Sequence, residues 1–149
     1  MYLIGILIFL VFLVALASFS GPLGIFIDLP SLVVILAVTV PIQMASGLLP
    51  DLGKGFRLMG SRTNPYSLIE LKRIRQSLRL AFRSLLLSGG LGSLVGTISL
   101  LAHLEDPARI GPSLAIAMLT FLYAMVLSFL LLPIHARVHA MIDTLEEAD

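Results

Sequence analysis

Hydrophobic positions fill four long stretches of this chain, and polar positions gather between them. A membrane-spanning helix needs about 20 mostly apolar residues to cover the hydrocarbon of a bilayer. The runs at 2–18, 30–49, 84–102 and 112–134 approach or meet this length, and none contains Asp, Glu, Lys, Arg or His. The pattern therefore predicts an all-α membrane protein with four transmembrane helices in a single membrane domain, 1–149.

Composition agrees with this prediction. Of the 149 residues, 58% are hydrophobic and 13% charged, and the mean hydropathy is +1.02. A 16.1 kDa core cannot hide this much apolar surface, so lipid must solvate the rest. No Lys or Arg precedes the first run, which argues against a signal peptide. The chain has no Cys, which excludes disulfides, thiolate metal ligands and Cys nucleophiles.

The connection between the second and third runs changes character along its length. Residues 50–65 are rich in Gly, Pro, Asn and Ser and predict an irregular linker. From Tyr66 onward, apolar residues recur at helical spacing beside a basic stripe, which predicts a short basic amphipathic helix. Its cations would meet anionic head groups at the membrane surface, or would steer ions or dock a partner. The apolar positions are Leu71, Ile74, Leu78 and Phe82, and the basic ones are Lys72, Arg75, Arg79 and Arg83.

The distribution of basic residues predicts orientation. Eight of the ten Lys and Arg residues lie in 50–83, whereas 19–29 has none and the third connection has only Arg109. By the positive-inside rule the region 50–83 is cytoplasmic, and four spans then place both termini in the cytoplasm.

Small residues in the third run form two adjacent helical ridges. Such ridges allow close helix packing in lipid, or they line a narrow polar path. Packing is the default interpretation of such ridges, and the Thr97 hydroxyl adds weight to the polar path because its neighbours are small. One ridge is Ser88, Gly92 and Gly96, and the other is Gly89, Ser93 and Thr97.

The fourth run has few polar residues. Thr120 and Tyr123 share a helical face, and Pro133 can kink the helix near its end. Asp106 before Pro107 predicts a helix start, as does Asp28 two residues before Pro30.

The chain carries none of the residue patterns that catalysis requires. It has no Ser/His/Asp array, HExxH motif, phosphate-binding Gly loop or pair of intramembrane carboxylates, so we predict no enzyme and no cofactor. His135, His139 and Asp143 share a helical face beyond the fourth run, where ordinary surface polarity explains them better than a metal site. A proton pathway needs an ionisable group in the membrane, which a partner would have to supply.

Several strings resemble the MotA branch of the MotA/TolQ/ExbB proton-channel family. Residues 104–112 read LEDPARIGP, like the loop before the family's fourth span, and 115–120 read AIAMLT, followed by Tyr123. Residues 132–134 (LPI) resemble the end of that span. FIDLPSL at 26–32 is similar to the start of the second span, and VGT at 95–97 to part of the third.

The resemblance implies a homopentameric stator subunit in the bacterial inner membrane. The pentamer would surround two copies of a single-span partner, similar to MotB, ExbD or TolR, whose membrane Asp carries the ion. Proton or sodium flow past that Asp would drive mechanical work. The ion pathway would include Thr97, Thr120, Phe121 and Tyr123, with Pro133 near its cytoplasmic exit.

Three positions or segments depart from the family pattern. The family has Pro at the place of Gly90 and Thr at the place of Phe121, and its cytoplasmic domain is much longer than 50–83. A non-conducting pentameric scaffold, holding a partner or lipid, is the alternative function. A membrane-surface adaptor acting through the basic helix is a third.

Overall fold

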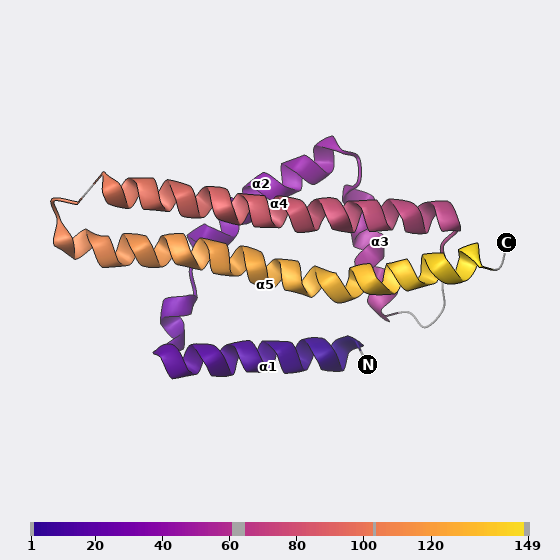
Figure 1. Cartoon of the computed structure of the whole chain (residues 1–149), viewed down its shortest axis with the longest axis horizontal. Coiled ribbons are helices and arrows are strands. Elements are labelled where there is room, and N and C mark those ends of the chain that lie inside the picture. Colours follow the sequence, from indigo (N-terminus) through magenta and orange to yellow (C-terminus); the bar gives the residue numbers. More distant parts are fainter. Residues whose placement is uncertain (1, 61–64, 103, 148–149) are drawn as a thin grey trace.

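The computed structural model describes residues 2–60, 65–102 and 104–147, and the regular structure in this part of the chain is helical. Figure 1 shows the arrangement. In chain order the elements are α1 (Tyr2–Ser20), the short 3-10 turn η1 (Leu23–Phe26), α2 (Leu29–Ala45), α3 (Leu49–Gly60), α4 (Leu68–Leu101) and α5 (Pro107–Glu146).

The antiparallel pair α4 and α5 forms the body of the molecule (Figure 1). Helix α2 crosses this pair, and α3 lies across it where α4 begins and α5 ends. Helix α1 lies apart from the bundle and approaches α5 through the rings of Phe9 and Phe129, whose centroids are 5.9 Å apart. Most of the α1 surface is therefore exposed.

Side-chain caps define where three of the helices begin. The Asp28 carboxylate accepts a hydrogen bond from the Ser31 amide at 3.1 Å, and Asp106 accepts one from the Ala108 amide at 3.2 Å. Both helix starts predicted from the sequence are confirmed. Helix α4 begins with a capping box, in which Ser67 and Glu70 satisfy each other's backbone amides.

Within the described residues, three segments are long and apolar enough to cross a membrane: Leu23–Ala45, Leu68–Leu101 and Ile110–Glu146. They contain most of the predicted second, third and fourth runs, and they give the chain the pattern of a multi-pass membrane protein. The first run forms a shorter apolar helix, Ile4–Ser20.

The prediction of an irregular linker over 50–65 is wrong for most of that segment, because 49–60 form α3. Its Gly and Pro residues suit a packed helix. Pro50 stands in the first turn, where no intrahelical amide is needed. A Cβ on Gly55 would lie 3.3 Å from Ile74 Cγ2, so the glycine lets α3 approach α4 closely. Asp51 and Leu58 are buried on the same side.

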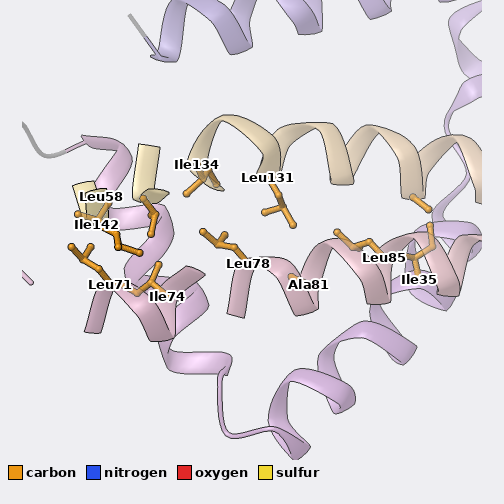
Figure 2. Packing of buried hydrophobic residues seen from close by; sticks show 12 residues of the cluster. Ile35, Leu58, Leu71, Ile74, Leu78, Ala81, Leu85, Leu131, Ile134 and Ile142 are labelled. Atoms are coloured by element: carbon orange, nitrogen blue, oxygen red, sulfur yellow. The ribbon is translucent and has the colours of Figure 1, made fainter. Parts of the chain in front are cut away.

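The basic helix is not a separate short element. It is continuous with the third run in α4, because the capping box starts the helix and no Pro interrupts 68–101. Figure 2 shows Leu78, Ala81 and Leu85 of α4 facing Leu131 and Ile134 of α5. The predicted apolar stripe is buried in this core at Leu71, Ile74 and Leu78, and Phe82 packs against it.

Candidate functional site

Three glycines of α4 meet α5 at very short range. A Cβ on Gly89 would lie 2.2 Å from Ala124 Cβ, and one on Gly96 would lie 2.8 Å from Ala117 Cβ. Between them, a Cβ on Gly92 would lie 2.6 Å from Thr120 Cγ2. We call Gly89, Gly92 and Gly96 the glycine seam. It combines members of both ridges predicted from the sequence, because three- and four-residue steps alternate along the true contact line.

Helix α2 brings a row of polar side chains into the bundle. The Thr39 and Ser88 hydroxyl oxygens are 3.5 Å apart, and the Gln43 amide donates to the Ser77 carbonyl at 3.0 Å. Hydrogen bonds of this kind hold helices together where water is excluded. We call the buried polar side chains of α2, α4 and α5 the polar seam: Ser31, Thr39, Gln43, Ser77, Ser84, Ser88, Thr120 and Ser128.

Thr120 belongs to a chain of hydrogen bonds that joins three side chains. Its hydroxyl oxygen lies 2.8 Å from that of Ser31, and the Ser31 hydroxyl donates to the Asp28 carboxylate. Thr120 Oγ1 also lies 2.9 Å from the Ile116 carbonyl of its own helix. A continuous polar path therefore leads from the interior of α5 to the capped start of α2.

Two atoms of the polar seam lack a hydrogen-bond partner among the described residues. They are Gln43 Oε1 and Ser128 Oγ. Buried polar atoms are nearly always paired, so each of these can take a further hydrogen bond.

Thr97 lies away from the polar seam. Its hydroxyl donates to the Ser93 carbonyl one turn back at 2.8 Å, and both residues are half-buried. Nine residues separate Thr97 from Ser88, which turns it by about 180° around the helix axis. Thr97 therefore lies on the side of α4 opposite to Ser88, and Ser93 lies about 140° from Ser88. No hydrogen bond joins Thr97 to Thr120 within the described residues.

The other residues of the predicted ion pathway have separate environments. Tyr123 fastens α5 to the start of α2, because its phenol oxygen accepts from the Asp28 amide at 2.8 Å and its hydroxyl donates to the Phe26 carbonyl. Phe121 is 43% exposed on the surface of α5. Pro133 lies within an unbroken α5 and lines a groove of about 400 Å³ facing α1.

The predicted membrane-surface cations fall into two classes. Lys72 forms a 2.6 Å ion pair with Glu146 at the end of α5. Arg75, Arg79 and Arg83 form no ion pair within 4.0 Å in the part of the chain that the structure describes. They line an open groove beside the turn between α2 and α3.

The histidine pair at the end of α5 makes local contacts. His139 Nδ1 lies 3.1 Å from Asp143 Oδ1, and the rings of His135 and His139 meet edge to face at 6.5 Å. No group of three possible ligands close enough to hold a metal is found among the described residues.

Sequence reasoning missed the α2 contribution to the polar seam. Ser31, Thr39 and Gln43 stand at multiples of four residues, together with Ile35, and all four are buried. The i, i+4 spacing of polar residues within an apolar run was the available signal. Its partners on α4 and α5 could not be known without the packing.

Comparison with known proteins gives a partial match to a chemotaxis protein. No family model matches the chain. A segment of 40 residues is 48% identical to the chemotaxis protein PomA of Vibrio alginolyticus. The match covers 27% of this chain and 16% of that protein, so the similarity is local.

Proposed function

We propose that the chain is a stator-type subunit of an ion-driven membrane motor. In this proposal it crosses the membrane four times and assembles as a pentamer around a single-span partner. The partner's membrane Asp carries protons or sodium ions, and their flow does mechanical work in the cell envelope. The observation that carries the proposal is the pair of half-buried hydroxyl side chains Ser93 and Thr97 on α4, in a set of apolar runs (30–49, 84–102 and 112–134) that contain no Asp, Glu, Lys, Arg or His, so that a partner must supply the acid.

The partial match supports the same assignment. The relative is named as a chemotaxis protein and is a stator protein of the MotA family, whose MotA branch this chain resembles. The match covers only 16% of the relative, so we assign the relative's activity to this chain only as part of the proposal.

A fourth span is consistent with the dimensions of α1. Its 19 residues extend over about 28 Å at 1.5 Å per residue, close to the thickness of the hydrocarbon. With four spans, the basic connection lies in the cytoplasm together with both termini.

The two polar faces of α4 suggest a division of roles. The polar seam is internal, and Thr120 and Ser31 fix α2 against α5 there. Thr97 and Ser93 are half-buried outside the polar seam, so we place the partner's Asp and the ion beside them. In the proposal Phe121, which is exposed on α5, also faces the partner.

The first experiment measures what the subunit assembles with. The complex is extracted from its own membrane in mild detergent, and its native mass and co-purifying chains are determined. Five copies with two copies of a single-span, Asp-containing chain support the proposal. Five copies alone favour the scaffold function, and any other count contradicts the pentamer.

The second experiment measures ion flux in vesicles containing the complex. Thr97→Val removes the hydroxyl and keeps the size of the side chain. We expect ion flux to fall at least tenfold, because losing a polar contact of about 1.4 kcal/mol raises the barrier to ion passage by that amount. Thr144→Val, at the exposed end of α5, is the matched control. Equal flux in Thr97→Val and the control would remove Thr97 from the path.

A further inference from the structure

A basic groove runs along the first half of α4. It has a volume of about 850 Å³ and opens to the surface. Arg75, Arg79 and Arg83 stand on one side at four-residue spacing, with Gln76 beside them. Ser46 and Leu48, from the turn between α2 and α3, form part of the other side. We call this the arginine groove.

The arginine groove carries more positive charge than the carboxylates beside it balance. Lys72 and Arg73 also line it, but Glu146 and Asp51 pair with them at 2.6 and 3.0 Å. No carboxylate lies within 4.0 Å of the guanidinium groups of Arg75, Arg79 or Arg83 in the described residues, although the charge of Arg75 acts on Glu146 from farther away. Guanidinium groups bind phosphate oxygens through paired hydrogen bonds, so this row fits a phosphate group.

The position of the arginine groove along α4 indicates that the phosphate belongs to a lipid. Arg83 is the last charged residue before 84–101, which carry no charge at all. The groove therefore lies where α4 leaves the hydrocarbon, at the depth of lipid phosphates.

A second, apolar groove adjoins the first. It has a volume of about 280 Å³, shares Arg79 and Arg83 with the arginine groove, and is lined by Phe82, Leu131 and Leu132. A phospholipid has both a phosphate for the arginines and hydrocarbon for this apolar surface. Inorganic phosphate, and any phosphate compound without an apolar part, would leave the apolar groove empty.

We infer that the arginine groove binds the head group of an anionic phospholipid, with Arg79 and Arg83 as the central phosphate ligands. A zwitterionic lipid fits less well because the three guanidinium groups repel its cation. The inference does not depend on ion conduction. Only the assignment to the cytoplasmic leaflet rests on the proposed topology.

The test uses the whole chain in detergent, offered equal amounts of phosphatidylglycerol and phosphatidylcholine. Native mass spectrometry counts the lipids retained. We expect wild type to retain phosphatidylglycerol preferentially. This result tests the inference even if a variant fails to fold. Arg79→Gln with Arg83→Gln should weaken that retention at least tenfold, since both central phosphate ligands lose their charge. Arg57→Gln, an exposed arginine of α3 outside the groove, is the control and should retain the lipid.

Four outcomes would overturn the inference. The first is equal retention of the two lipids by wild type, and the second is unchanged retention in the double variant. The third is displacement of phosphatidylglycerol by inorganic phosphate at equal concentration, and the fourth is a co-purifying protein that the double variant loses while its lipids remain. The lipid count is independent of pentamer formation and flux, so failure here and failure of the proposed function are distinguishable.

Discussion

Single glycines decide how closely α4 and α5 approach. At Gly89 an added methyl group would overlap the Ala124 side chain, whereas at Gly90 nothing lies within 4 Å. These two adjacent glycines therefore differ in whether they can accept a larger side chain. In lipid, where helices gain little from hydrophobic burial, such close contact contributes much of the association energy.

We expect Gly89→Ala to destabilise the protein by about 1–3 kcal/mol, the usual cost of overpacking. Gly90→Ala is the control and should cost nothing, because the added methyl group points into open space. Unfolding by sodium dodecyl sulfate in mixed micelles, followed by circular dichroism, measures both.

The variant Gly89→Ala with Ala124→Gly moves the methyl group from one helix to the other and should regain most of the lost stability. If Gly89→Ala proves as stable as Gly90→Ala, the two helices do not make the contact described here.

At the scale of elements, α3 is held to α4 by a buried carboxylate. Asp51 accepts from Arg73 Nε at 3.1 Å and pairs with Lys54 at 3.3 Å. Lys54 also donates to Glu70 at 3.2 Å, and its hydrogen bonds to Glu70 and Asp51 raise its pKa above the usual value. Asp51 thus links α3 to α4 through its ion pair with Arg73.

Replacing Asp51 with Ala should release α3 from α4 at a cost of about 1–3 kcal/mol, the range for hydrogen bonds to charged groups. Amide hydrogen exchange should then quicken across 49–60 and stay slow in the core of α4. Arg57→Ala, an exposed change in the same helix, should leave the exchange pattern of wild type. Unchanged protection of α3 in Asp51→Ala would contradict this role.

Elements with a long, regular pattern could be predicted from the sequence, and short ones could not. The apolar runs predict the long helices because lipid imposes a minimum length on any span. The composition of 50–60 suggests a loop, yet Gly55 serves a close contact with Ile74 that only tertiary packing reveals. The site divides in the same way. Thr120 is apparent as a polar residue in an apolar run, but its partner Ser31 lies 89 residues away in sequence.

At the scale of the whole molecule, one face of the bundle has no partner within the described chain. Helix α4 buries one side against α5 and α2, while large apolar residues on its other side remain exposed. These are Leu87, Leu91, Leu94, Ile98 and Leu101. They recur in alternating steps of four and three, as they do along a helix-packing face. The proposed pentamer would cover part of this face and of the exposed surface of α5.

In a ring, each copy presents one surface to its neighbour and receives a different one, so two distinct sites are needed to link every interface. The chain has no Cys, so introduced thiols are the only ones present. With Leu94→Cys on α4 and Met118→Cys on α5, both at exposed positions, a short bis-maleimide should give a ladder of products ending at five copies. Leu94→Cys alone should stop at two, because each copy then has one thiol. A ladder that ends at another number would contradict the pentamer, and no cross-linking at all would mean that lipid covers these faces.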